Sequence, residues 1–191
     1  MNAGTPWLTV IGIGEDGVDG LSAVARSTLD AAEVLVGGER HLTMVPEDSR
    51  ERLVWGSSLA ATLDQITDMS GRPVAVLATG DPMWYGVGAT LCRTVPPEEM
   101  SIIPAPSAFS LAASRLGWPL AETECLTVHG RAIDRVRYFL SPDARMIILS
   151  NDGETPAEIA NILIETGFGQ SAMFVFTHMS GPNEDMLAAP A

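Results

Sequence analysis

Apolar runs of strand length alternate along this chain with segments whose apolar residues recur at helical spacing. Such alternation is typical of a mainly parallel sheet covered by helices, because parallel neighbours need a long crossover connection. The sequence therefore predicts an α/β fold. The predicted strands are residues 7–13, 34–36, 53–55, 74–78, 101–103, 125–128, 146–149 and 172–177, and the predicted helices are 22–32, 59–66, 87–94, 107–116, 136–140 and 156–166.

A proline-rich turn interrupts this alternation near the middle of the chain. Pro104 and Pro106 break the pattern, and Ser107 can cap the small-residue helix that follows. We therefore predict two small α/β domains, residues 1–105 and 106–191. No strand is expected after residue 177, where the chain has only a weakly apolar tail.

The charge balance excludes several classes of protein. Asp and Glu number 24 against 11 basic residues, all of them Arg, and the formal net charge is -13. Without Lys the chain can form neither a P-loop nor a Schiff base. Nucleic-acid binding is not expected either, because neutralising phosphates requires a basic footprint that this composition supplies only in small patches.

The cysteine count and the length of the apolar runs indicate the cellular compartment of the protein. Cys92 and Cys125 are too few and too far apart in sequence for a disulfide framework or a cysteine-rich zinc site, so we expect no bound metal. No apolar run reaches the roughly 18 residues of a membrane span, and the N-terminus lacks the features of a signal peptide. We expect a cytoplasmic protein with no membrane partner.

A glycine-rich turn follows the first predicted strand. Residues 12–17 match the pattern G-x-G-x-x-G, and Glu39 lies at about the right distance downstream for a ribose contact, so an NAD-type oxidoreductase is one interpretation. However, Glu15, Asp16 and Asp19 would place three carboxylates beside a pyrophosphate, and the next helix starts late. A plain structural turn and the rim of a cleft for a different ligand are the alternatives.

A second loop, residues 78–86, leaves the most apolar predicted strand with the sequence Ala-Thr-Gly-Asp-Pro-Met-Trp-Tyr-Gly. Ligands of open α/β sheets bind outside the carboxyl ends of the strands. Gly80 permits a close backbone approach, Pro82 stiffens the turn, and Asp81 adds a carboxylate. The loop is therefore a candidate ligand site, with an ordinary turn as the alternative.

Five segments together indicate a family: 10–14, 37–42, 79–86, 104–110 and 126–131. In their order and spacing they resemble the tetrapyrrole methylases, the S-adenosylmethionine-dependent enzymes of cobalamin and sirohaem synthesis. The resemblance extends from Trp7 to about Met186. Gly-Glu-Arg-His-Leu at 38–42 and His-Gly-Arg at 129–131 are most similar to the carbon-5 methylating domain of the precorrin-6Y C5,15-methyltransferases.

The resemblance implies two domains that enclose a cleft, with S-adenosylmethionine folded inside it and not in a Rossmann site. It implies methylation of carbon 5 of a precorrin, precorrin-6B/6Y, in cobalamin biosynthesis. A sulfonium is cationic, so carbonyl oxygens and a carboxylate are suitable neighbours for it. The implied cofactor-binding residues are Gly80, Asp81, Pro82, Met83, Ser107, Ala108, Asn151 and Asp152.

The implied substrate is a tetrapyrrole that carries acetate and propionate groups, so it requires cations. Arg binds carboxylates in a bidentate manner and keeps its charge. The implied substrate-binding residues are Gly12, Gly14, Glu15, Arg40, His41, His129 and Arg131.

Methyl transfer is an in-line displacement from sulfur to carbon, so positioning should supply most of the catalysis. The ring must also lose a proton. Asp81, Glu15, His129 and His41 could each assist, and the sequence does not choose among them.

Two departures from the family pattern affect these expectations. Residues 178–181 are His-Met-Ser-Gly where relatives carry a segment similar to Glu-Asn-Leu-Gly, which weakens the transfer of cofactor contacts there. The carbon-15 methyltransferase and decarboxylase domain of bifunctional relatives is also not visible, so we expect either a fragment cut near a domain junction or a chain that lacks its partner domain. A homodimer is expected from the family, and a non-catalytic tetrapyrrole-binding fragment is the remaining alternative.

Overall fold

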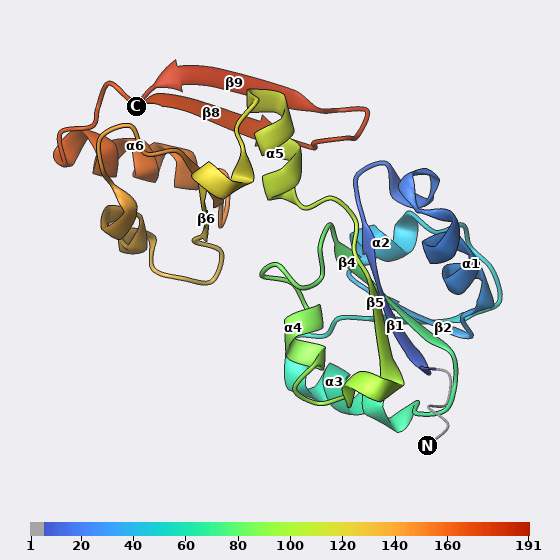
Figure 1. Ribbon diagram of the computed structural model, residues 1–191. Coiled ribbons are helices and arrows are strands. Elements are labelled where there is room, and N and C mark those ends of the chain that lie inside the picture. Colours follow the sequence, from blue (N-terminus) through green and yellow to red (C-terminus); the bar gives the residue numbers. More distant parts are fainter. Residues whose placement is uncertain (1–5) are drawn as a thin grey trace. The chain divides into compact units, whose positions relative to one another are not determined.

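The computed structural model describes residues 6–191, which form two compact units that divide after Ser107 (Figure 1). Each unit has its own hydrophobic core and is described by itself. Within the described residues, no helix combines the length and the apolar character needed to cross a bilayer.

A five-stranded sheet forms the centre of the first unit, in the order β3-β2-β4-β1-β5. Every neighbouring pair of strands is parallel. Burial extends along all of β1 and nearly all of β4, as expected for the central strands of a parallel sheet that is covered on both faces. The strands are β1 (Leu8–Ile13), β2 (Val34–Gly37), β3 (Glu51–Val54), β4 (Val74–Thr79) and β5 (Met100–Ile103).

Serine caps begin the two long helices of this unit. Ser22 Oγ accepts a hydrogen bond from the backbone N of Ala25 at 3.2 Å, and Ser58 Oγ accepts one from the backbone N of Ala61 at 3.3 Å. These bonds satisfy amides that have no partner inside the helix. The helices are α1 (Ala23–Ala31), α2 (Glu39–Thr43), α3 (Leu59–Asp68) and α4 (Gly88–Leu91), with 3-10 turns at Gly17–Gly20 and Pro97–Glu99.

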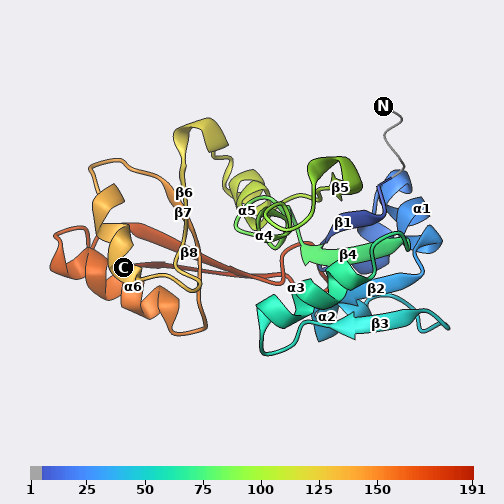
Figure 2. The same ribbon diagram turned by 90° about the horizontal axis from the view of Figure 1, so that it is seen from below.

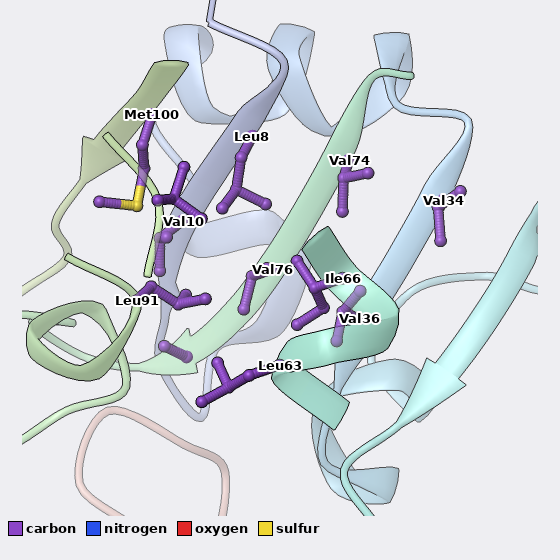
Figure 3. Close-up of a cluster of buried hydrophobic side chains, with 12 residues drawn as sticks. Leu8, Val10, Val34, Val36, Leu63, Ile66, Val74, Val76, Leu91 and Met100 are labelled. Atoms are coloured by element: carbon purple, nitrogen blue, oxygen red, sulfur yellow. The ribbon is translucent and has the colours of Figure 1, made fainter. Parts of the chain in front are cut away.

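Side chains of the central strands alternate between two cores. Val10 and Val76 pack with Ile66 of α3 in one core (Figure 3), and Ile11 and Leu77 pack beneath α1 and α2 in the other. Figures 1 and 2 show α1 and α3 on opposite faces of the sheet. The strand period of two therefore divides one run of apolar residues between two helical layers.

The carboxyl ends of β1 and β4 approach closely at Gly12. Gly80 N donates a hydrogen bond to Ile13 O at 3.0 Å, and Ala105 N donates one to Gly80 O at 3.1 Å. A Cβ atom at Gly12 would lie 2.0 Å from Gly80 O and 2.4 Å from Ala105 N. Position 12 therefore has no room for a side chain.

The second unit contains two small sheets. β6 (Glu124–Thr127) and β7 (Met146–Leu149) are parallel, whereas β8 (Ala172–Thr177) and β9 (Asp185–Pro190) form an antiparallel hairpin. Phe109 of α5 (Ala108–Leu116) packs with Ile147, and Ile159 of α6 (Thr155–Glu165) packs with Val128. The two helices thus bury different sets of strand side chains. The unit also contains 3-10 turns at Leu120–Glu122 and Ile133–Phe139.

An ion pair closes the turn between β8 and β9. Arg115 at the end of α5 donates to the Glu184 carboxylate from Nε at 2.7 Å and from Nη2 at 2.8 Å. The Ser180 backbone N donates to the same carboxylate at 2.6 Å. His178 and Ser180 have positive φ angles of 49° and 67°, a conformation that disfavours side chains. The Arg115–Glu184 ion pair therefore stabilises a strained turn.

The α/β prediction is confirmed, and every predicted strand is present within two residues of its expected bounds. Four expectations need correction. A 3-10 turn at Ile133–Phe139 replaces the predicted helix 136–140, and only Gly88–Leu91 of the predicted helix 87–94 is helical. α2 was not predicted, and β9 forms where no strand was expected. β9 lacks the alternation of a half-buried strand because all six of its residues are exposed, and it depends on backbone pairing with β8. Of the two sheets in the second unit, one is therefore parallel and the other antiparallel.

We predict that Gly12→Ala lowers the free energy of unfolding by about 3 kcal/mol, since the new Cβ must displace backbone atoms. Gly56→Ala is the matched control, because its Cβ would meet only Thr62 Oγ1 at 3.5 Å. Urea unfolding followed by tryptophan fluorescence measures both. Equal losses in the two variants would contradict the close approach at position 12.

We also predict a pH-dependent role for Glu184. The Arg115 hydrogen bonds, followed by the Ser180 amide, lower the pKa of Glu184 from 4.5 to about 2. Because the folded-state pKa is depressed, the stabilisation is complete above pH 4.5 and is lost as the pH falls toward 2. Glu184→Gln should therefore destabilise the protein at pH 7 and make progressively less difference below pH 4.5.

Denaturant unfolding at a series of pH values tests this role. Glu122→Gln is the control, because the Glu122 carboxylate lies 3.9 Å from Arg145 and is 70% exposed. A Glu184→Gln deficit that stays constant from pH 7 to pH 2 would rule the ion pair out as its cause.

Candidate functional site

Loops that leave β1 and β4 begin side by side at the carboxyl edge of the first sheet, where the register pairs Ile13 with Thr79. The short helix α2 follows β2 at the same edge. Ligands of open parallel sheets bind at such an edge. Residues 14–22 and 80–87, together with α2, therefore form the candidate site of the first unit.

Four polar side chains meet at this edge, and we call Glu15, Arg40, His41 and Thr79 the Arg40 cluster. Arg40 Nη1 forms an ion pair with Glu15 Oε1. Arg40 Nη2 lies 3.3 Å from both Thr79 Oγ1 and His41 Nε2, and His41 Nε2 lies 2.9 Å from Thr79 Oγ1. The structure thus brings together three of the predicted site residues and adds Thr79, which the prediction missed.

His41 does not supply a positive charge to this cluster at neutral pH. Burial lowers the pKa of its imidazole, the Arg40 guanidinium lowers it further, and Glu15 acts in the opposite direction. His41 Nδ1 is buried and has no hydrogen-bond partner among the described residues. The cationic charge of the cluster is therefore that of Arg40, and the neutral His41 ring does not repel the guanidinium.

Arg52 of β3 binds carbonyl groups at the C-terminal end of α2 and just beyond it. Its Nη1 donates to Leu42 O at 2.7 Å and to Val45 O at 3.1 Å, and its Nη2 donates to Pro46 O at 2.5 Å. A cation at the C-terminal end of a helix satisfies carbonyls that lack partners in the helix. Arg52 therefore helps to fix a helix of only five residues and, with it, Arg40.

The Gly-Asp-Pro loop after β4 is held by its own backbone. Gly80 adopts a φ of +57°, and a Cβ there would lie 3.0 Å from Pro106 O and 3.1 Å from Ser107 Cα. Asp81 Oδ1 accepts a hydrogen bond from the Met83 backbone N at 2.9 Å, and Pro82 O accepts one from Gly88 N at 3.0 Å.

This loop also presents large side chains to solvent. Met83, Trp84 and Tyr85 are exposed, although large apolar side chains are usually buried. The site prediction included Met83 and omitted Trp84 and Tyr85. Their exposure beside a rigid turn is the signal that the sequence alone could not provide.

The geometry of residues 12–17 disfavours a dinucleotide site. The Asp16 carboxylate fills the bend, because a Cβ at Gly14 would lie 2.6 Å from Asp16 Oδ1 and one at Gly20 would lie 1.9 Å from Asp16 Oδ2. α1 begins only at Ala23, so its N-terminus does not follow the glycines directly as pyrophosphate binding requires. An acidic side chain thus occupies the bend in which an NAD-type cofactor would need amides.

Predicted site residues of the second unit also lie close together. Gly130 N donates to Asn151 Oδ1 at 3.4 Å, and Asn151 Nδ2 donates to Asp152 Oδ2 at 2.9 Å. This bond from Asn151, followed by the Thr155 hydroxyl and the Glu154 amide, lowers the pKa of Asp152.

Asp152 is engaged at the start of α6. Its Oδ1 accepts hydrogen bonds from Thr155 N at 3.1 Å and from Thr155 Oγ1 at 3.0 Å. Thr155 was not among the predicted site residues. His129 and Arg131 flank Gly130 in an exposed turn that is anchored by His129 N to Thr127 Oγ1 at 3.2 Å.

Comparisons with known proteins agree with this architecture. The family model for tetrapyrrole (corrin/porphyrin) methylases matches residues 7–191. A precorrin-6Y C(5,15)-methyltransferase (decarboxylating) from Sinorhizobium sp is 46% identical over 181 residues, which cover 94% of this chain and 44% of that relative. The chain therefore spans less than half the length of that relative.

Two further comparisons cover most of both chains. A cobalt-precorrin-7 C(5)-methyltransferase from Salmonella typhimurium is 30% identical over 177 residues, covering 93% of this chain and 87% of the relative. The crystal structure of a Thermus thermophilus uroporphyrin-III C-methyltransferase complexed with S-adenyl homocysteine superposes with a TM-score of 0.70 at 20% identity, covering 96% and 87%. The family match over residues 7–191, together with the Salmonella relative, shows that the chain belongs to the tetrapyrrole (corrin/porphyrin) methylases.

Proposed function

We propose that the protein is an S-adenosylmethionine-dependent C-methyltransferase that methylates carbon 5 of a precorrin in cobalamin biosynthesis. The observation that carries the proposal is the position of the Arg40 cluster, in which Thr79 directly precedes the Gly-Asp-Pro loop. A carboxylate-binding cation is thereby fixed next to the loop proposed for the cofactor. The relatives' names, a precorrin-6Y C(5,15)-methyltransferase and a cobalt-precorrin-7 C(5)-methyltransferase, support carbon 5 as the target.

The residues of the Gly-Asp-Pro loop fit S-adenosylmethionine, which supplies an electrophilic methyl group on a cationic sulfur. Gly12 and Gly80 let the loop pack against the backbone of residues 105–107, which fixes its shape. Asp81 contributes a carboxylate that its bond to Met83 N holds in place, and a negative charge favours a sulfonium neighbour. We assign cofactor binding to Gly80, Asp81, Pro82, Met83 and Ser107. Roles for Ala108, Asn151 and Asp152 stay predictions.

Substrate recognition rests on arginine. Arg40 supplies the positive charge of its cluster, and Arg131 is exposed in the same turn as His129. We assign these groups to the carboxylates of the tetrapyrrole, since a guanidinium holds carboxylates with two donors. Gly12 is buried against the backbone of Gly80 and Ala105, and Gly14 faces the Asp16 carboxylate, so both glycines shape the loop and their contact with the macrocycle stays a prediction.

The candidate proton acceptors are Asp81, Glu15, His129 and His41. Glu15 is already engaged by Arg40, and Asp81 Oδ1 already accepts a hydrogen bond from Met83 N. Neither bond excludes proton transfer, and positioning is the larger contribution in an in-line displacement.

Other assignments extend the proposal. A homodimer is proposed from the family resemblance and a cytoplasmic location from the composition, whereas activity at carbon 15 is not assigned to this chain. Sedimentation of the purified protein tests the dimer, with a monomer mass over the working concentration range counting against it.

We predict that Asp81→Asn discriminates between the two forms of the cofactor. Asn retains Oδ1 for the Met83 amide but removes the charge, so affinity for cationic S-adenosylmethionine should fall roughly three- to tenfold. Affinity for S-adenosylhomocysteine, whose sulfur is neutral, should change much less. Isothermal titration of both ligands measures the difference.

Asp64→Asn is the matched control, since Asp64 lies on the exposed side of α3. An equal loss for both ligands would place Asp81 away from the sulfur. Failure of the unaltered protein to bind either ligand would remove the methyltransferase proposal. Binding of both cofactor and tetrapyrrole without methyl transfer would favour a non-catalytic tetrapyrrole-binding role.

A further inference from the structure

The geometry points to Glu15 as an internal carboxylate that occupies Arg40 until a carboxylate of the substrate replaces it. This inference rests on the proposed tetrapyrrole substrate and assigns Glu15 a role in carboxylate exchange. Arg40 comes from α2, which follows β2, and Glu15 comes from the loop after β1. The two charges meet because β2 and β1 flank β4 and end at the same edge of the sheet.

The two ends of the Arg40 guanidinium have different partners. Nη1 contacts the Glu15 carboxylate, whereas Nη2 lies 3.3 Å from Thr79 Oγ1 and 3.3 Å from His41 Nε2. The Thr79 and His41 groups are neutral at neutral pH, and they would keep holding Nη2 if Glu15 moved away. Nη1 is therefore the exchangeable end, and Nη2 is the anchored end.

The solvent exposure of the Arg40–Glu15 ion pair favours exchange. The Arg40 side chain is 48% exposed and the Glu15 side chain is 29% exposed, so an incoming anion can reach the guanidinium from solvent. Exposed ion pairs contribute little to stability, because water and salt screen both charges. Replacing one carboxylate by another at Nη1 conserves the ion pair, and the cost of displacing Glu15 is small.

Exchange also explains how a strongly acidic chain can bind a polycarboxylate. With Glu15 in place, Arg40 keeps a defined orientation and is paired with a carboxylate, the same chemical group that the substrate would present to it. A free carboxylate on the tetrapyrrole can take over this contact, whereas an amidated or esterified side chain offers no negative charge to compete with Glu15.

The test measures binding of uroporphyrin III, a tetrapyrrole with acetate and propionate side chains, by quenching of its fluorescence. Glu15→Gln keeps the shape of the side chain and removes the competing charge, so the porphyrin should bind roughly two- to fivefold more tightly. Arg40→Gln should weaken binding roughly three- to tenfold. In the double variant the gain from Glu15→Gln should vanish, because the competition requires Arg40.

Asp16→Asn is the matched control. It removes the same charge from the neighbouring residue, and the Asp16 carboxylate lies against Gly14 and Gly20. The inference expects little gain in this variant. An equal gain in Asp16→Asn would show a general effect of net charge and overturn the exchange, and so would unchanged or weaker binding by Glu15→Gln.

Two experimental outcomes distinguish failure of this inference from failure of the proposed function. If the unaltered protein binds the porphyrin and Glu15→Gln gains nothing, only the exchange is overturned. If the unaltered protein binds no porphyrin, the tetrapyrrole substrate is overturned together with the exchange. S-adenosylhomocysteine affinity, measured on each variant, confirms that its fold is intact, and Glu15→Ala repeats the test if the Gln variant is unstable.

Discussion

The close approach of the backbone at Gly12, Gly80 and Ala105 is the constraint on which the first unit depends. Hydrogen bonds from Gly80 N to Ile13 O and from Ala105 N to Gly80 O join the ends of β1 and β4 to the start of the proline-rich segment. Because no side chain fits at position 12, the loops that follow both strands leave from one compact point. Thr79 and the Gly-Asp-Pro turn are thereby placed beside the residues of α2.

Charge is arranged locally in this chain. The net charge of -13 disfavours extended phosphate binding, yet it permits a few arginines to act where acids are already engaged. Arg40 pairs with Glu15, Arg115 with Glu184, and the guanidinium of Arg52 with helix carbonyls. Only the first of these pairs lies at the candidate site with its cation half exposed, and the proposed recognition of a polycarboxylate is therefore assigned to it.

Sequence patterns predicted the strands well because apolar runs such as 74–78 reflect burial on both faces of a parallel sheet. They missed α2, in which only Leu42 is buried and whose C-terminal carbonyls depend on Arg52 from a distant strand. They missed β9, which depends on pairing with β8. Glu15, Arg40 and His41 were predicted one by one, but their contacts and the contribution of Thr79 follow from strand order, which local patterns do not specify.

Transfer of an isotopically labelled methyl group tests the account most directly. The protein is incubated with methyl-labelled S-adenosylmethionine and a carbon-5-unmethylated precorrin, and the product is examined by NMR. The account predicts one labelled methyl group on carbon 5 of the macrocycle and stoichiometric S-adenosylhomocysteine. Absence of label from the tetrapyrrole, with both ligands bound, or label on a different ring carbon would contradict it.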